Sequence, residues 1–291
     1  MKKIFFNTVL MIFVISFFAN NLFAQKSRGT TNVPQKPIVT TTTAPQKFFV
    51  TVNAQYGFRT KNSYNDYNYT ETSTKTTAEN INSSLGNGLN AGGALGYMFT
   101  KNIGAEVGIS YFSGDKNKKT VIFTNYKSSV THSSNMLQIN PSLIISAGLK
   151  KINPYAKFGY MIGSGSILRE YNENKNGDIT LMKFKYTDGL ALGLNASVGV
   201  LYSLNDNISL FGQVNMTDMT YAPTKGERTE WTVNGVDQLP NATVNQKQIE
   251  YVDSYTEDSN NPQPDSQPYK DLKRYYPFNS FGFSLGLKYG F

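Results

Sequence analysis

The residues that could act as a general base and a nucleophile lie close together at one point of the sequence. His132, the only histidine, stands two positions before Ser134. On an extended strand these two side chains share a face, so the imidazole could activate the hydroxyl. A carboxylate should orient such an imidazole, yet neither Asp nor Glu occurs between Ser134 and Leu149. We therefore expect His132 to be a strand-end residue of a protein that is not an enzyme and needs no cofactor.

Thiols and acidic clusters offer little further chemistry. The sequence has no cysteine, which excludes thiol catalysis and thiolate metal sites. Carboxylates that could bind a divalent cation gather near the end of the chain. Their spacing matches no established cation-binding loop, so we expect a solvated, mobile loop and no metal site. These acidic residues are Asp253, Glu257, Asp258 and Asp265.

Four charged residues lie in stretches where apolar and polar residues alternate. Each of the four belongs to the alternating set whose other members are small or polar. They are Arg59, Glu106, Lys157 and Lys288. Acidic and basic side chains can form an ion pair if the fold brings them together. Whether these four meet depends on the elements that carry them.

Eight segments alternate between apolar and polar residues, as strands with one apolar face do. In residues 48–58, Val50 and Val52 share one face, while Asn53 and Gln55 share the other. The remaining segments are residues 89–99, 103–111, 137–149, 155–162, 190–202, 208–217 and 281–291.

The connections between these segments alternate between long and short. Three are tight turns at residues 100–102, 150–153 and 205–207. Barrels of bacterial outer membranes show this asymmetry, with long loops outside and short turns in the periplasm. The pattern predicts an all-β fold, an eight-stranded antiparallel transmembrane up-and-down β-barrel with four long outer loops. Those loops are residues 60–88, 113–134, 164–186 and 219–278.

A secreted soluble β-sandwich also alternates but needs large side chains on its inner face. Here one face is mostly Gly, Ser, Asn, Gln and Ala, whereas Leu, Val, Ile and Phe take the other. An apolar face of that extent would aggregate in water. The membrane barrel is therefore favoured over the sandwich.

The N-terminus has the form of an export signal. Lys2 and Lys3 precede an apolar run of about 15 residues, shorter than a spanning helix, and Ala24 suits cleavage. The sequence predicts a signal peptide over residues 1–24, a disordered periplasmic tail rich in Thr and Pro over residues 25–47, and the barrel domain over residues 48–291.

The signal, the eight alternating strands and a last strand of alternate aromatics resemble the small outer-membrane β-barrel proteins of Gram-negative bacteria, the OmpA-like transmembrane-domain and OmpX/OmpW-like group. The resemblance implies a porin-family barrel in the cell outer membrane, with outer-membrane lipid and the barrel assembly machinery as partners. It also implies that Leu287, Tyr289 and Phe291 form the assembly signal, although they could be an ordinary strand end. Residues 132–134, His-Ser-Ser, resemble the His-x-Ser of outer-membrane lipid A deacylases, an alternative that the missing carboxylate disfavours.

The interior of an eight-stranded barrel is only wide enough for side chains. An unpaired charge there is costly, so we expect Glu106 to pair with Lys157 or Lys288, with Arg59 nearer the outer end. Such a pair would act either as a permanent plug of the lumen or as an openable gate. The sequence leaves both roles open.

Function is expected to reside in the outer loops. Connections longer than about 15 residues are usually functional or disordered, and residues 219–278 contain the only tryptophan, Trp231. Tyr67 and Tyr69 of the first loop would also suit a contact surface. We expect adhesion or binding of a surface ligand through residues 219–278, with a narrow gated pore for small solutes as the alternative. The formal charge of +8 is scattered along the sequence, so no nucleic-acid partner is expected.

Overall fold

The computed structural model describes residues 47–60, 66–81, 83–257 and 262–291. The expected signal peptide and, apart from Lys47, the expected tail lie outside these residues. None of the helices in the described ranges is long and apolar enough to cross a membrane.

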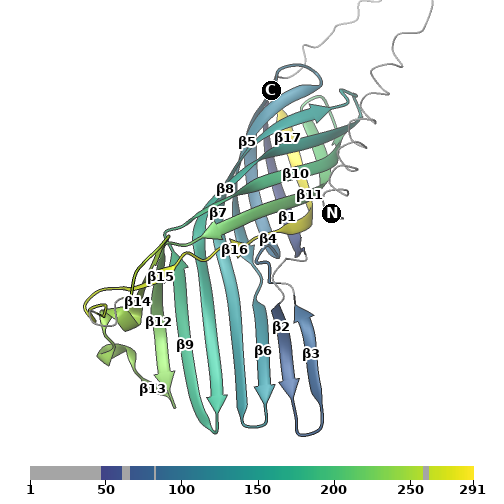
Figure 1. Cartoon of the computed structure of the whole chain (residues 1–291). Helices are drawn as coiled ribbons and strands as arrows, with labels where there is room; N and C mark the ends of the chain where they lie inside the picture. The colour runs from purple at the N-terminus through teal and green to yellow at the C-terminus, as the bar shows by residue number, and fades with distance from the viewer. Residues whose placement is uncertain (1–46, 61–65, 82, 258–261) are drawn as a thin grey trace, which may run out of the picture. The chain divides into compact units, whose positions relative to one another are not determined.

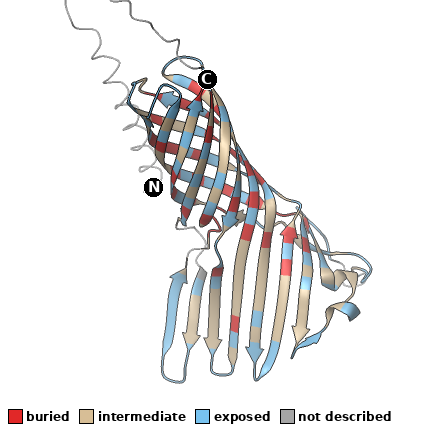
Figure 2. Ribbon diagram, turned by 180° about the vertical axis from the view of Figure 1, so that it is seen from behind, coloured by how far each residue is buried: buried red, intermediate tan, exposed pale blue. Residues whose placement is uncertain are grey.

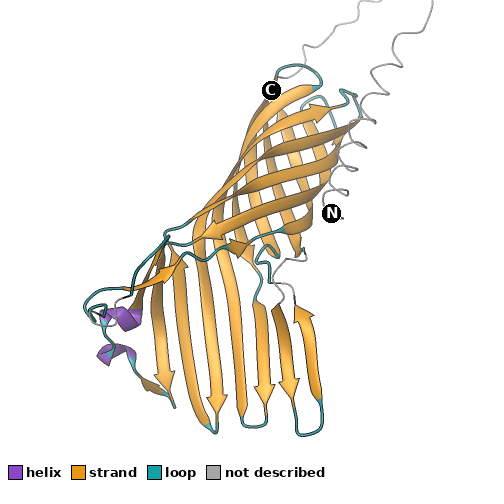
Figure 3. Cartoon of the chain, viewed as in Figure 1, coloured by secondary structure: helices purple, strands orange, loops and turns teal. Residues whose placement is uncertain are grey.

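Eight antiparallel strands form a closed ring of backbone hydrogen bonds (Figures 1 and 3). Each strand pairs with the next ring strand along the chain, and the last pairs with the first, so the sheet has no free edge at the level of the membrane. The predicted eight-stranded barrel is thereby confirmed. The strands are β1 (Phe48–Arg59), β4 (Gly88–Met98), β5 (Ile103–Gly114), β7 (Tyr126–Ser146), β8 (Ile152–Lys175), β10 (Leu190–Ser203), β11 (Ile208–Ala222) and β17 (Ser280–Gly290).

The alternation of the sequence becomes an inside and an outside, visible as stripes of burial along the strands in Figure 2. In β17, Leu285 is 73% exposed, whereas its neighbour Ser284 is 1% exposed. Polar residues such as Asn215 and Thr217 are buried in the lumen. The outward face is therefore the apolar one, as a barrel surrounded by lipid requires.

Aromatic rings collect near both ends of the outward face. At the end that holds the short turns, the ring centroid of Phe48 lies 4.7 Å from that of Tyr97 and 6.3 Å from that of Phe291. At the other end, the rings of Tyr56 and Phe58 are 5.1 Å apart. These two groups have the positions of interfacial aromatic girdles.

Leu285 lies at the middle of β17 and provides a test of lipid contact. We expect Leu285→Arg to lower the free energy of unfolding by about 2–4 kcal/mol, because a cation at the centre of the bilayer loses its hydration. Chemical denaturation of protein refolded in phospholipid vesicles, followed by circular dichroism, measures this change. Leu272→Arg, at an exposed position of the outer sheet, is the control and should have little effect. Equal stability of the two variants would contradict the lipid-facing position.

The four long connections are largely folded into a second part of the sheet. Strands β7 and β8 contain 21 and 24 residues, far more than the roughly 9–11 residues that cross a membrane. Their outer halves form the centre of a sheet whose strand order is β3–β2–β6–β7–β8–β9–β12–β14–β15. We call this part, from β3 to β15, the outer sheet (Figure 1).

The outer sheet differs from the mobile connection expected at residues 219–278, because its strands satisfy one another's backbone hydrogen bonds. Only β2–β6 and β14–β15 are parallel pairs. The additional elements are β2 (Asp66–Glu71), β3 (Thr76–Ile81), β6 (Asn117–Phe123), β9 (Asp178–Thr187), β12 (Lys225–Val233), β13 (Val236–Asp237), η1 (Leu239–Asn241), α2 (Val244–Lys247), β14 (Gln248–Val252), β15 (Tyr269–Leu272) and β16 (Tyr276–Pro277).

Candidate functional site

The lumen contains an ion pair between β5 and β8. Lys157 Nζ donates to Glu106 Oε1 at 2.7 Å, and both side chains are buried, at 12% and 7% exposure. Lys288, the other candidate partner of Glu106, lies against an aromatic ring instead: its Nζ is 3.8 Å from the ring centroid of Phe49. The geometry therefore joins Glu106 to Lys157 and places Lys288 on an aromatic face. Its role as plug or gate stays a prediction.

Aromatic and polar side chains fill the space around this pair. The Nζ of Lys157 lies 5.3 Å from the ring centroid of Tyr155 and 5.6 Å from that of Phe211. Tyr155 donates its hydroxyl hydrogen to Gln213 at 2.7 Å, and Gln213 donates to Asn215 at 2.6 Å. The remaining cavity at this level measures about 70 Å³, which is room for a few water molecules rather than for a solute.

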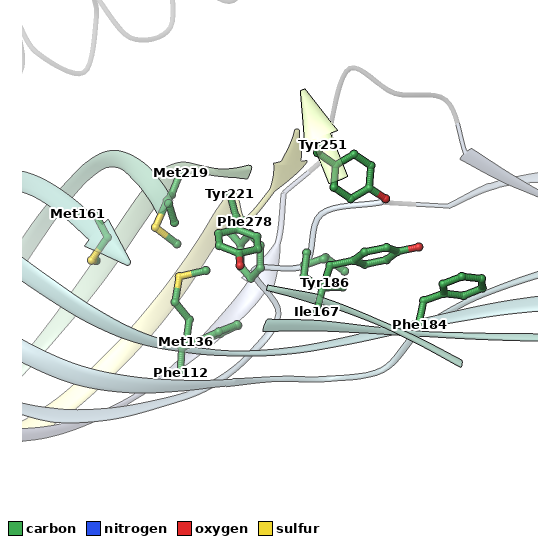
Figure 4. Close-up of a cluster of buried hydrophobic side chains, with 12 residues drawn as sticks. Phe112, Met136, Met161, Ile167, Phe184, Tyr186, Met219, Tyr221, Tyr251 and Phe278 are labelled. Atoms are coloured by element: carbon green, nitrogen blue, oxygen red, sulfur yellow. The ribbon is translucent and has the colours of Figure 1, made fainter. Parts of the chain in front are cut away.

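A second, apolar layer of side chains lies at the outer end of the lumen, where the sequence predicted only Arg59 (Figure 4). Phe278 follows β16 and is 2% exposed. Its ring centroid lies 6.0 Å from that of Phe112 and 6.3 Å from that of Tyr221. Met136 and Met219 belong to the same buried cluster. We call these five residues the outer cap. The only sign of them in the sequence is that they are large side chains on the strand face that otherwise carries small and polar residues.

Arg59 lies away from the ion pair. Its guanidinium Nη2 donates to the carbonyl oxygen of Lys116 at 3.1 Å, in the segment that joins β5 to β6. Arg59 itself is the last residue of β1 and pairs in register with Ser280. The expected position near the outer end therefore agrees with the structure, but Arg59 contacts a backbone carbonyl rather than the buried carboxylate.

The three expected assembly residues share the outward face of β17. Leu287, Tyr289 and Phe291 are all exposed. The ring of Phe291 packs 6.1 Å from that of Tyr289, and its backbone N–H donates to the carbonyl of Phe48 at 3.0 Å. This arrangement leaves their apolar surface available to lipid or to another protein. Recognition by assembly machinery stays a prediction.

His132 lies within β7 rather than at the end of a strand, because that strand continues into the outer sheet. Its neighbours across the strands are Asn117 and Arg169, and neither is a carboxylate. Its ring centroid lies 6.3 Å from that of Tyr276. Ser134 is buried.

The acidic residues near the end of the chain do not converge. Among residues that the structure describes, no group of three or more His, Asp or Glu could hold a metal ion. Asp253 pairs instead with Lys273, whose Nζ lies 2.9 Å from its carboxylate. Asp258 lies outside the described ranges.

One face of the outer sheet carries aromatic and basic residues in register. Cross-strand partners in a sheet point to the same side. Arg169 of β8 is opposite Phe184 of β9, which is opposite Arg228 of β12. In the next row, Tyr171 of β8 and Trp231 of β12 flank Met182. The sequence predicted contact residues in the loops but could not show that strand pairing aligns them.

Tyr276 of β16 lies between this face and the outer cap: its ring centroid is 5.9 Å from that of Tyr186, and it pairs in register with Tyr221. Burial, with a further contribution from Tyr186, raises the pKa of Tyr276 to about 12 from the ordinary 10.0. The folded state therefore favours the protonated phenol. Its contribution to stability is complete below about pH 10 and is lost as the pH rises through about 12.

We accordingly expect the wild-type protein to lose more stability between about pH 9 and about pH 12 than the Tyr276→Phe variant does, since phenylalanine cannot ionise. Denaturation at the two pH values, with ultraviolet absorbance of phenolate recorded in parallel, tests this difference. Tyr67, which is exposed, provides the control through Tyr67→Phe. Identical pH profiles of wild type and Tyr276→Phe would exclude the effect.

The match to a known protein family agrees with this architecture. A family model described as outer membrane protein beta-barrel domain matches residues 40–237. Among solved structures, Neisserial surface protein A shares 13% identity, with 84% of this chain and 97% of that one covered and a TM-score of 0.34. CarO2 of Acinetobacter baumannii also shares 13% identity, with 84% and 100% covered and a TM-score of 0.32. No curated protein matches the chain. Because the family model spans more than half of the sequence, the chain belongs to the family of outer membrane protein beta-barrel domains.

Proposed function

We propose that this outer-membrane barrel is a non-enzymatic surface protein that binds a partner or an external surface through its outer sheet. The observation that carries the proposal is the continuation of β7 and β8 from the barrel into that sheet. Continuous strands hold a binding surface at a fixed position above the membrane, whereas mobile loops would have to be ordered on binding at an entropic cost. The outer sheet is thus a pre-organised platform.

Removal of part of the platform tests the proposal. We expect replacement of residues 225–270 by a short Gly-Ser linker to abolish adhesion of cells that carry the protein, because β12 and β14 are lost. The barrel strands are untouched, so circular dichroism of the purified variant should still show a folded barrel. Glu79→Ala, on exposed strand β3, is the control and should adhere normally. Adhesion of the deletion variant at the wild-type level would refute the proposal.

A narrow gated pore is the second candidate, in which the buried pair of Glu106 and Lys157 would be the gate. If that pair opens, the purified protein should show discrete conductance in a planar bilayer, and Glu106→Ala should alter it. The ion pair and the outer cap both support a plugged lumen, so we expect the wild-type protein to be silent. Silence of the wild-type protein over a range of voltages would support the plug.

Two partners belong to the same proposal. The apolar outward face suits outer-membrane lipid, and Leu287, Tyr289 and Phe291 are available to the barrel assembly machinery. Tyr289→Ser with Phe291→Ser should lower the amount of barrel inserted in the membrane of living cells, while the purified variant refolds in detergent. Insertion at the wild-type level would show that β17 carries no assembly signal at these positions.

A further inference from the structure

The aromatic and basic residues of the outer sheet form one continuous band. Ring centroids of Tyr69 and Phe123 are 5.3 Å apart, and those of Phe123 and Tyr126 are 5.9 Å apart. The hydroxyl of Tyr126 then lies 3.4 Å from that of Tyr171. Since neighbouring strands are about 4.8 Å apart, a band from β2 to β12 across β6, β7, β8 and β9 is about 24 Å long. We call it the aromatic band; it comprises Tyr67, Tyr69, Phe123, Tyr126, Tyr171, Trp231, Arg169 and Arg228, and the two arginines pack on the buried ring of Phe184.

Two arginines lie at the end of the band nearest β12. The guanidinium carbon of Arg228 is 4.3 Å from the ring centroid of Trp231 and 5.0 Å from that of Phe184. Arg169 lies 6.0 Å from the same Phe184 ring and 5.9 Å from that of Tyr171. Stacking holds a guanidinium by its faces and leaves its edge donors free for a planar anion.

Neither arginine forms an ion pair with a carboxylate in the described part of the chain, although other cations of the outer sheet do. Lys183 pairs with Glu230, and Lys225 pairs with Asp188. Arg228 Nε is buried and has no hydrogen-bond partner among the described residues. This end of the band therefore complements an anion.

The other end of the band has a different chemistry. Tyr67 and Phe123 expose 45% and 40% of their surfaces. Tyr69 donates to the carboxylate of Glu71 at 2.9 Å. In the middle of the band, on β8, Tyr171 donates to the carboxylate of Glu173. Carboxylates next to exposed rings can accept hydrogen bonds from hydroxyl groups of a ligand, but they repel a ligand that is negatively charged along its whole length.

We propose that the aromatic band binds an acidic oligosaccharide. Its sugar rings lie with their C–H faces on the aromatic side chains, its hydroxyl groups donate to Glu71 and Glu173, and its carboxylates receive bidentate hydrogen bonds from Arg169 and Arg228. This inference rests on the proposed binding function and assigns it a ligand class. A single-stranded nucleic acid would also stack on aromatic rings, but its phosphates would meet the two carboxylates. The length of the band suits an oligomer rather than a single sugar.

The test uses the full mature protein refolded in detergent, with titration calorimetry as the readout. The probe is a hyaluronan hexamer, in which a neutral sugar alternates with each glucuronate, so that neutral sugars can lie next to Glu71 and Glu173. We expect saturable binding that weakens at least about tenfold in the double variant Arg169→Gln/Arg228→Gln, since glutamine cannot form the two charge-assisted hydrogen-bond pairs with the carboxylates of the probe. Trp231→Ala should weaken it as well. The matched control, Lys127→Gln/Lys185→Gln, removes two exposed cations from the opposite face of the same sheet and should bind as the wild type does.

Several outcomes would overturn the proposal. These are no binding of the hexamer, an equal loss in both double variants, and equally tight binding of a neutral maltohexaose or of a single-stranded oligonucleotide. If a second copy of the chain covers the band, light scattering should give a dimer mass that falls to that of a monomer in Trp231→Ala, which would also overturn it. Adhesion of cells carrying Arg169→Gln/Arg228→Gln distinguishes failure of the proposed ligand from failure of the proposed function. Normal adhesion with lost hexamer binding keeps the proposed function and rejects this ligand.

Discussion

Replacing Glu106 with alanine should lower the free energy of unfolding by about 3–5 kcal/mol, the usual cost of removing one partner from a buried ion pair. Lys157 would keep its charge in the lumen, and Lys288 lies close enough to interact electrostatically with both members of the pair. The variant would thus have two cations in a narrow interior without their carboxylate. Chemical denaturation of the refolded protein, followed by circular dichroism, measures the loss.

A second substitution separates the charge from the packing. Glu106→Leu combined with Lys157→Met removes both charges and keeps most of the volume, so it should recover most of the stability that Glu106→Ala loses. Glu79→Ala, in the exposed edge strand β3, serves as the control for the loss of a carboxylate and should change the unfolding free energy by less than about 0.5 kcal/mol. A Glu106→Ala variant as stable as Glu79→Ala would show that the pair contributes nothing to the barrel.

Replacing Phe278 with alanine should cost about 3–5 kcal/mol, because the ring is almost fully buried and its removal leaves a cavity. The residues around it belong to the walls of the barrel: Phe112 to β5, Met136 to β7 and Tyr221 to β11. They are fixed by strand pairing and can collapse only partly into the space. Denaturation of the purified variant measures the effect, and Tyr275→Ala, at an exposed position nearby, should change little.

The same variant tests how the lumen is closed. If the outer cap and the ion pair close it in series, neither Phe278→Ala nor Glu106→Ala alone should conduct in a planar bilayer, whereas the double variant should show discrete openings. Openings in the single Phe278→Ala variant would show that the ion pair is not a barrier. Silence of the folded double variant would show that other side chains, such as Tyr155 and Phe211, keep the lumen closed.

The barrel was predictable from the sequence because its signal is local. A strand with lipid on one side and a narrow lumen on the other must alternate, and every second residue from Phe281 in β17 to Phe291 just after it is apolar. The same alternation placed Glu106, Lys157 and Lys288 on the face that points into the lumen. Because an unpaired buried charge is costly, Glu106 had to pair with a cation, and the sequence left Lys157 and Lys288 as candidates.

Only the tertiary structure decided which partner Glu106 takes, which side chains meet at the outer end of the lumen and what the long connections form. Glu106 and Lys157 are on strands separated by β7, and Phe278 reaches Met136 across more than a hundred residues, so their meeting depends on strand register and not on local pattern. The sequences of the outer-sheet strands show no clear alternation of apolar and polar residues, because strands such as β3 (Thr76–Ile81) are exposed along almost their whole length. These strands depend on pairing with their neighbours. A sequence determines which side chain a strand presents to each face; contacts between distant strands are determined by how the whole sheet closes.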